Sequence, residues 1–196
     1  MKPRLRRSND VSTAVATATE APRASAQAAF EALYRESRDD VFAYVTGLLR
    51  DRSAAEEVTS AAFEKAWRKR RQIDPERGSA RTWLFGIARN AALDELRRLS
   101  RRADLHDDAS AESAGAGGYP VGPSGGDPAE VAIRRTALRQ AMASLSGRER
   151  ELVALKFFAG LSNSEIAEVI GASETNAGTR IHRVVQKLRR SFDEAA

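Results

Sequence analysis

Residues able to carry out catalysis are scarce in this chain of 196 residues. It contains no cysteine, which excludes disulfides, thiolate zinc sites and cysteine nucleophiles. Its two histidines, His106 and His182, lie far apart in sequence, which argues against a metal cluster or a histidine-based triad. The neighbours Glu56 and Glu57 would point in different directions around a helix, whereas the two carboxylates of a catalytic pair must face the same site. We therefore expect no enzyme, no metal site and no cofactor.

The clearest chemical pattern is a basic helix that follows a short acidic one. A capping-box pair, Ser162 and Glu165, predicts a helix to Ile170, and a turn at 171–173 precedes a second helix from Glu174 to about Arg190. Two short helices joined by a glycine-containing turn are the arrangement that places the second helix in the DNA major groove. That helix is rich in basic residues: Arg180, Arg183, Lys187, Arg189 and Arg190. An ordinary helical hairpin with a basic outer face is the alternative.

A second basic surface lies earlier in the chain. Its arginines would neutralise phosphates and so supply affinity that does not depend on sequence: Arg77, Arg81, Arg89, Arg97, Arg98, Arg101 and Arg102. Trp83, Phe85 and Asn90 lie between these charges, and aromatic rings beside arginines can hold unstacked bases. Packing in the core is an equally good interpretation of Trp83.

The elements that must position these residues fall into two groups of helices. Apolar spacing predicts helices over 30–50, 53–71 and 80–101, the second headed by a Ser53 and Glu56 capping box and the third capped by Ser79. In the second group it predicts helices over 131–145 and 146–158, ahead of the helix-turn-helix. Because aromatic residues make up only 6% of the chain, small separate cores are favoured over one large core.

Charge divides the chain at the same place. The formal net charge is +5, but residues 103–130 hold six acidic residues and no lysine or arginine, so the remainder carries +11. Residues 103–128 are also rich in glycine and proline, which predicts a flexible acidic linker. We therefore predict an all-α fold of two small helical domains, 26–102 and 129–196, after a disordered tail over 1–25. With no apolar run long enough to span a bilayer, we expect no membrane insertion.

Three segments resemble a known family. They are FEALYRESRDDVFAYV at 30–45, IDPERGSARTWLFGIARNAALDELRR at 73–98 and LSGRERELVALKFFAGLSNSEIAEVIGAS at 145–173. Together they are similar to bacterial sigma factors of the sigma-70 family, extracytoplasmic-function (ECF) type, which consist of domains two and four. The resemblance implies a cytoplasmic factor, nucleoid-associated through RNA polymerase, that binds core polymerase at the clamp helices and flap and directs promoter-specific initiation. It also implies promoter DNA and an anti-sigma factor as partners.

The resemblance implies roles for particular residues. Polymerase docking would fall to Glu56, Glu57, Val58, Ala62 and Phe63. Recognition and melting of the −10 promoter element would fall to Asp74, Arg77, Ser79, Arg81, Trp83 and Asn90. Reading of the −35 element would fall to Ser173, Glu174, Thr175, Asn176, Gly178, Thr179, Arg180 and Arg183. The acidic linker would be either a plain tether or a mimic of nucleic acid inside the polymerase channels.

Two other classes of protein fit part of the pattern. A LuxR-type transcriptional regulator carries a similar helix-turn-helix, but an α/β receiver domain usually precedes it, and no period-two strands are evident in the first half of this chain. A helical interaction module without DNA contact would leave the basic surfaces of both halves unexplained.

Overall fold

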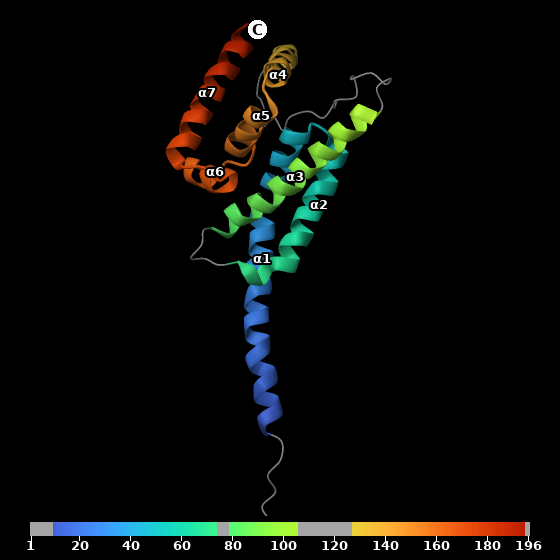
Figure 1. Cartoon of the computed structure of the whole chain (residues 1–196), viewed down its shortest axis with the longest axis vertical. Coiled ribbons are helices and arrows are strands. Elements are labelled where there is room, and N and C mark those ends of the chain that lie inside the picture. Colours follow the sequence, from blue (N-terminus) through green and yellow to red (C-terminus); the bar gives the residue numbers. More distant parts are fainter. Residues whose placement is uncertain (1–9, 74–78, 106–126, 195–196) are drawn as a thin grey trace, which may run out of the picture.

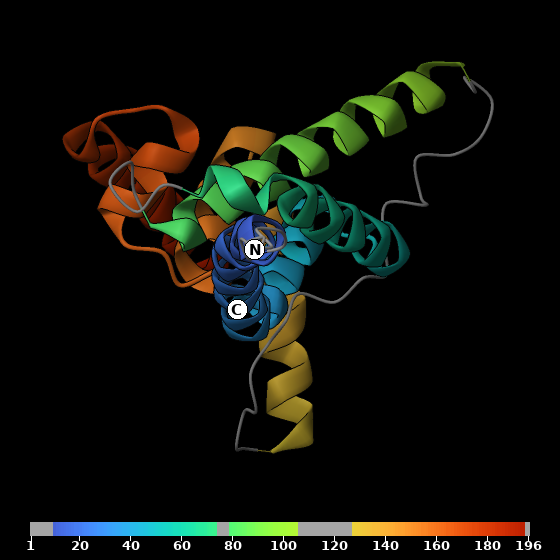
Figure 2. The same ribbon diagram turned by 90° about the horizontal axis from the view of Figure 1, so that it is seen from below.

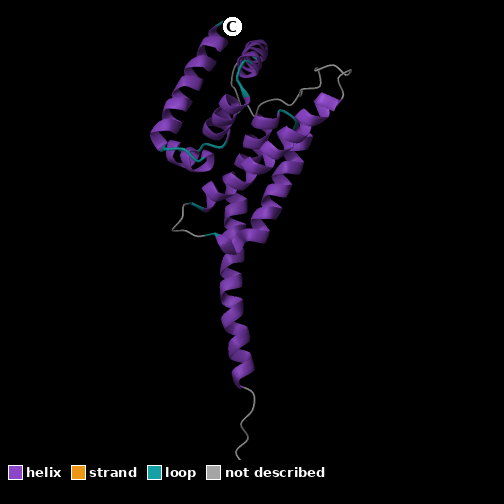
Figure 3. Cartoon of the chain, viewed as in Figure 1, coloured by secondary structure: helices purple, strands orange, loops and turns teal. Residues whose placement is uncertain are grey.

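The computed structural model describes residues 10–73, 79–105 and 127–194. Within these ranges the chain forms helices and no strand (Figure 3), which confirms the all-α prediction. A search of the same ranges for a helix with the length and apolar character to cross a membrane finds none. Asp74 and Arg77, two of the predicted −10 residues, lie outside the described residues, as does most of the predicted linker.

The first group of helices forms a bundle. It contains α1 (Asp10–Leu49), α2 (Arg52–Lys69) and α3 (Ala80–Leu105), with the 3₁₀ turn η1 (Arg70–Gln72) after α2. Each of the three helices contacts the other two, and one end of α1 extends beyond the bundle (Figure 1). The buried side chains between them include Val41, Tyr44, Val45, Leu48, Ala55, Ala62, Leu84, Phe85 and Ala88.

The first two helices begin at other residues than predicted. α1 starts at Asp10, well before Phe30, and so passes through residues expected to form a disordered tail; this stretch is rich in alanine, which has the highest helix propensity. α2 is capped by Asp51, whose side chain accepts a hydrogen bond from the Ala54 N–H at 3.0 Å. The capping box predicted at Ser53 is therefore wrong, because an equally good cap residue lies two positions earlier.

The second group is a smaller bundle built around the last helix. Its members are α4 (Pro128–Ala143), α5 (Gly147–Val153), the π-helical turn η4 (Ala154–Phe158), α6 (Asn163–Ile170) and α7 (Glu174–Asp193). α4, α5 and α6 all contact α7. The other helices of this bundle are therefore held together mainly by packing against α7.

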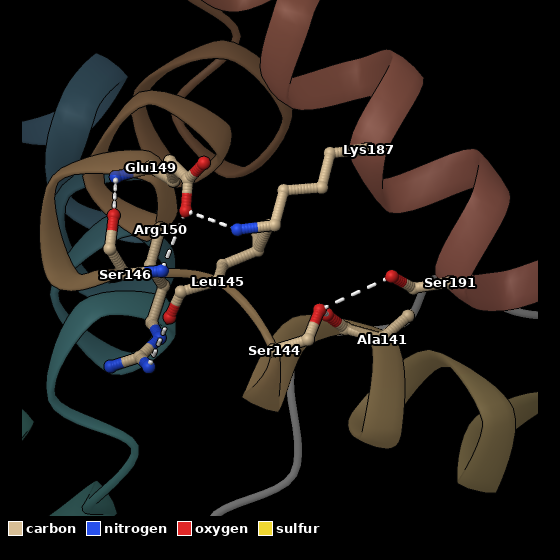
Figure 4. Close-up of polar contacts among 8 residues, drawn as sticks. All are labelled: Ala141, Ser144, Leu145, Ser146, Glu149, Arg150, Lys187 and Ser191. Atoms are coloured by element: carbon tan, nitrogen blue, oxygen red, sulfur yellow. Dashed lines mark hydrogen bonds and ion pairs between the residues drawn. The ribbon is translucent and has the colours of Figure 1, made fainter.

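Polar contacts join α4 and α5 to α7 (Figure 4). The Ser144 hydroxyl lies 3.3 Å from that of Ser191, and the Lys187 ammonium donates to the Glu149 carboxylate at 2.8 Å. Glu149 also accepts from the Ser146 N–H at 2.7 Å and completes the predicted capping box at the start of α5. One carboxylate thus fixes both the start of α5 and its position against α7.

The two groups touch each other, and their buried residues form one continuous cluster. η4 packs on α1, and α6 packs on α3. In Figure 2 the far end of α3 extends away from this contact, while α4 points in another direction. The expectation of small separate cores is therefore wrong for this arrangement, because buried residues of the two bundles pack against each other.

Candidate nucleic-acid and polymerase interfaces

The helix-turn-helix forms as predicted. Ser162 and Glu165 make a capping box at the start of α6, and Ser173 caps α7 by accepting from the Asn176 N–H at 3.3 Å. Between the helices, Gly171 has φ 69° and ψ 44°, a left-handed backbone conformation that residues other than glycine and asparagine rarely adopt. The Ala172 N–H closes the turn on the Ala167 carbonyl at 2.8 Å. The turn therefore fixes the angle at which α7 leaves α6.

α7 presents one face to the core and the other to solvent. Ala177, Ile181 and Val184 are buried against the rest of the second bundle. The exposed residues of its first half are Glu174, Thr175, Asn176, Thr179, Arg180, His182 and Arg183. An exposed N-terminal half that carries amide, hydroxyl and guanidinium groups is what a major-groove reading helix needs.

Two of the predicted −35 residues have other tasks in this structure. The Ser173 hydroxyl is occupied in capping α7. Gly178 is half-buried, and a Cβ added there would point toward the Asn163 side-chain amide at 3.4 Å. It therefore faces α6, where a Cβ would stand at ordinary van der Waals distance from Asn163.

Three of the predicted −10 residues, one just before α3 and two on it, line a cavity of about 800 Å³. Ser79, Trp83 and Asn90 all contribute to its wall. Ser79 is held in place because its hydroxyl accepts from the Thr82 N–H at 3.0 Å and lies 2.7 Å from the Thr82 hydroxyl. Trp83 is half-buried, so it both packs against the core and faces the cavity. A polar and aromatic wall of this kind suits an unstacked base.

Other residues complete this cavity wall. Gln72 at the end of η1, Ile73 just after it and Gly86 on α3 lie on the side that belongs to the first bundle. Glu168 and Val169 of α6 close the cavity from the second bundle. No local pattern in the sequence indicates these last two residues, because they reach the cavity only through the contact between the bundles.

Arg81 does not join the other predicted −10 residues. Its guanidinium pairs with Asp40 at 3.0 Å and donates to the Ala159 carbonyl at 2.5 Å. It also lies over the Phe85 ring, with 5.2 Å from Cζ to the ring centroid. In this structure Arg81 therefore links α1, α3 and the end of η4, with its charge already satisfied.

The predicted polymerase-docking residues divide into two sets. Glu56 and Glu57 are exposed on α2, whereas Val58, Ala62 and Phe63 are buried in the first bundle. The buried residues support the surface, and Phe63 also lines a groove of about 510 Å³ between α1 and α2. Tyr34 of α1 also lines this groove, where it is 43% exposed and its ring meets that of Phe63 edge-on.

The described residues hold no group of three or more potential metal ligands among histidine, aspartate and glutamate. The groups that the candidate interfaces present are cations, amides and aromatic rings, such as those of Arg180, Asn176 and Trp83.

Comparison with known proteins identifies two regions of the chain. Residues 33–102 match the family model for Sigma-70 region 2, and residues 135–188 match that for Sigma-70, region 4. The curated ECF RNA polymerase sigma factor SigL of Mycobacterium tuberculosis is 32% identical over 174 residues, which cover 87% of this chain and 93% of SigL. SigK of Mycobacterium sp. strain KMS is 30% identical over 164 residues, covering 82% of this chain and 81% of SigK.

Solved structures share the fold. The sigma factor RpoE in complex with the anti-sigma factor NepR from Bartonella quintana aligns with a TM-score of 0.65 at 21% identity, covering 84% of this chain and 96% of that one. CnrH in complex with the cytosolic domain of CnrY aligns with a TM-score of 0.61 at 21% identity, covering 89% and 97%. A match to region 2 over the first bundle does not favour the LuxR-type alternative. The chain belongs to the sigma-70 family as an ECF sigma factor, which directs RNA polymerase to specific promoters.

Proposed function

We propose that this sigma factor reads the −35 promoter element as duplex DNA with the first half of α7. The observation that carries the proposal is the exposed face of α7, where Asn176, Arg180 and Arg183 stand clear of the core while Ile181 is buried. Asparagine can pair with two atoms of adenine in the major groove, and the arginines can bind guanine or phosphate. Ser173 and Gly178 act by shaping the helix-turn-helix.

The −10 element is held as single-stranded DNA by the first bundle. Ser79, Trp83 and Asn90 form the wall that receives an unstacked base. Asp74 and Arg77, which lie outside the described residues, would act together with them on the −10 element. Capturing bases in this way stabilises the melted promoter without bond cleavage, so the chain contributes binding energy and performs no catalysis. The fold supports this division, because the two promoter elements fall to different bundles.

Docking on the polymerase clamp helices falls to the exposed face of α2 and its groove. Glu56 and Glu57 supply charge, and the groove with Tyr34 and Phe63 supplies apolar area. Val58 and Ala62 hold the helix in place from below. The second bundle would meet the flap, and residues 103–128 would connect the two regions.

An anti-sigma factor is a further proposed partner, and the cytoplasm the proposed location. Two solved structures that share the fold are complexes, one with the anti-sigma factor NepR and one with the cytosolic domain of CnrY. A regulator that covered α7 or the groove on α2 would keep the factor away from DNA or polymerase.

In vitro transcription with core RNA polymerase tests the whole proposal. The holoenzyme should start transcripts from promoter fragments that it selects from a genomic library, and core polymerase alone should not. Permanganate footprints should show melting around the −10 element. A chain that neither binds core polymerase nor supports any transcript would contradict the proposal.

A further inference from the structure

The end of α3 carries a basic surface to which the proposed function gives no task. Four arginines make up this surface: Arg97, Arg98, Arg101 and Arg102. Arg97 pairs with Asp94 at 2.7 Å. Arg98 pairs with Glu95 at 2.5 Å. The other two arginines are exposed, and no acidic side chain that the structure describes forms an ion pair with either of them.

A serine lies in the middle of these arginines. Ser100 is exposed on α3, and none of the residues that the structure describes shares a hydrogen bond with its hydroxyl. Of the described side chains on α3, that of Leu96 is the last to pack against the core. Figure 2 shows the end of the helix extending outward beyond this point. The hydroxyl is therefore accessible to a modifying enzyme.

Ser100 has the sequence context that one class of protein kinase recognises. Arg97 and Arg98 stand at the third and second positions before it, and no other serine or threonine of the chain has arginine at both positions. Kinases with an acidic substrate groove select this spacing, because their carboxylates bind guanidinium groups through charge-assisted hydrogen bonds. The spacing therefore indicates a phosphorylation site for a basophilic serine/threonine kinase.

The structure distinguishes Ser100 from another serine beside two arginines. Ser191 directly follows Arg189 and Arg190 on α7, the helix that packs against α4. It is half-buried, and its hydroxyl lies 3.3 Å from that of Ser144. Kinases bind their substrates in extended form, so α7 would have to separate from α4 before Ser191 could react. The exposed end of a helix unfolds locally at a much lower cost in free energy, which favours Ser100.

The arginines around Ser100 lie further along the helix that lines the −10 cavity. Asn90 belongs to the cavity wall, and Arg101 follows it by eleven residues, about 16 Å at 1.5 Å per residue. This distance corresponds to about 5 base pairs at 3.4 Å each. With the −10 element held at Asn90, Arg101 and Arg102 would reach phosphates of the adjoining duplex.

We propose that Ser100 is a phosphorylation site for a basophilic serine/threonine kinase, and that its phosphorylation weakens the binding of promoter duplex by the end of α3. In this reaction the Ser100 oxygen attacks the γ-phosphorus of ATP, and the bond between that phosphorus and the oxygen of ADP breaks. The hydroxyl proton passes to the catalytic base of the kinase, and ADP leaves. The effect on DNA rests on the proposed function, whereas the modification itself does not.

Phosphorylation would make this positively charged surface about neutral. Residues 94–102 together carry a net charge of +2. A phosphoserine adds a charge of about −1.5 to −2 at pH 7. A negative group near the C-terminal end of a helix also interacts unfavourably with the helix dipole, so it destabilises the last turns of α3. Both effects reduce the attraction of Arg101 and Arg102 for DNA phosphates.

Treatment of the folded chain with the catalytic subunit of cAMP-dependent protein kinase and ATP tests the modification. Every chain carries Ser8→Ala, because Ser8 also follows two arginines and lies outside the described residues. Mass spectrometry of peptides should locate the phosphate on Ser100, and Ser100→Ala should lose nearly all incorporation. No incorporation into the parent chain, or equal incorporation into Ser100→Ala through Ser191, would overturn the proposal.

Binding of DNA by the holoenzyme measures the consequence. The probe is a promoter fragment with an unpaired −10 element and duplex on the side of the −35 element, and the control is the single-stranded −10 element alone. Phosphorylation should weaken binding to the probe about tenfold or more and lower the slope of log affinity against log salt concentration by about 1 to 2, because each phosphate contact contributes about 0.9. Binding to the single strand should not change. Fluorescence anisotropy over a salt series gives both quantities.

Variants connect the loss with the arginines. Ser100→Ala treated with the kinase should bind both DNAs like the untreated parent, and Ser100→Glu should show part of the loss. The double variant Arg101→Ala and Arg102→Ala should show the loss on the forked probe without any phosphate. An equal loss on both DNAs after phosphorylation, or full binding by the double variant, would overturn the effect on duplex. If no chain binds either DNA, the proposed function fails, while incorporation of phosphate into the free chain still tests the modification.

Discussion

At the scale of single residues, Asn176 and Arg180 should contribute differently to binding of the −35 duplex. Asn176→Ala should weaken binding to a duplex selected by the parent holoenzyme by about 5- to 150-fold, the range of 1 to 3 kcal/mol for a good bidentate base contact. The same change should barely affect a scrambled duplex. Arg180→Ala should weaken binding to both, because a phosphate contact carries no sequence information. Fluorescence anisotropy with both duplexes measures the difference.

Gln186→Ala is the control for these two variants. Gln186 is also exposed on α7 but lies further along the helix, and its removal should leave both affinities unchanged. Equal losses on selected and scrambled duplexes for Asn176→Ala would show that this side chain does not read bases.

Glu149 gives a stability that depends on pH. The hydrogen bond from Lys187, with that from the Ser146 N–H, holds the pKa of Glu149 below its usual value. A carboxyl whose pKa is lower in the folded state stabilises the fold above the pKa of the unfolded chain, about 4.3, and this contribution is lost as pH falls through the folded value. The parent chain should therefore unfold at a higher temperature than Glu149→Gln at pH 7, and the difference should shrink below about pH 4.

Thermal unfolding followed by circular dichroism across pH 3 to 7 measures this convergence. Glu130→Gln is a suitable control, because Glu130 is an exposed residue paired with Arg134 on the surface of α4. A difference between the parent and Glu149→Gln that stays constant down to pH 3 would show that the charge of Glu149 does not stabilise the fold.

At the scale of elements, the turn between α6 and α7 should tolerate asparagine better than alanine. Gly171 has a left-handed backbone, and a Cβ there would meet no atom within 4 Å, so any cost of substitution comes from the backbone alone. Gly171→Ala should lower the free energy of unfolding by about 1 kcal/mol. Gly171→Asn should cost less, because asparagine adopts this conformation more readily. Urea unfolding of both variants measures the difference, and equal costs would contradict the backbone explanation.

Helix starts were predictable where the signal is local. The capping boxes at Ser146 and Ser162 each depend on a glutamate three residues later, and both form. Ser53 has the same pattern, but Asp51 competes for the same task from two positions earlier and takes it. A capping-box pattern within one turn thus predicts that a helix starts there. It does not decide which of two nearby polar residues is the N-cap.

The sequence predicted which segments contain the candidate site residues. It predicted less well which residues of those segments are exposed. The first half of α7 and the wall of the −10 cavity both contain residues chosen from the sequence, such as Asn176 and Asn90. Val58 and Phe63 were expected to take part in polymerase docking, and both are buried in the first bundle. On a helix, side chains that face the core lie directly beside side chains that face solvent. Which side of that boundary a residue occupies depends on its neighbours in the other helices.

At the scale of the whole molecule, the contact between the bundles was not readable from the sequence. Arg89 and Glu151 are 62 residues apart, and neither belongs to a motif that announces a partner. From the sequence, Gly47 is only a residue of low helix propensity inside α1. Its role is visible only in the structure, where the Phe158 ring occupies the space that a Cβ would need. Such pairs depend on how two complete bundles meet, so local periodicity and capping carry no information about them.

The length of chain between the two bundles should limit transcription. The separation of the promoter elements, about 85 Å, requires the bundles to part, and deleting residues 109–122 would leave about 8 residues between α3 and α4, with an extended length of about 28 Å. We expect transcription to fall at least tenfold. Unchanged transcription would show that the connection need not span the two sites.

Replacing the same residues with an equal number of glycines and serines separates length from charge. The stretch over 103–130 carries six acidic residues and no basic ones, in a chain whose remainder has a charge of +11. A neutral connection of the same length has the same reach, so a plain tether should keep full transcription after the replacement. A loss comparable to that of the deletion would instead assign a role to the acidic charge, as expected for a segment that imitates nucleic acid inside the polymerase. The comparison of the two chains on one promoter therefore decides which property of the connection the polymerase uses.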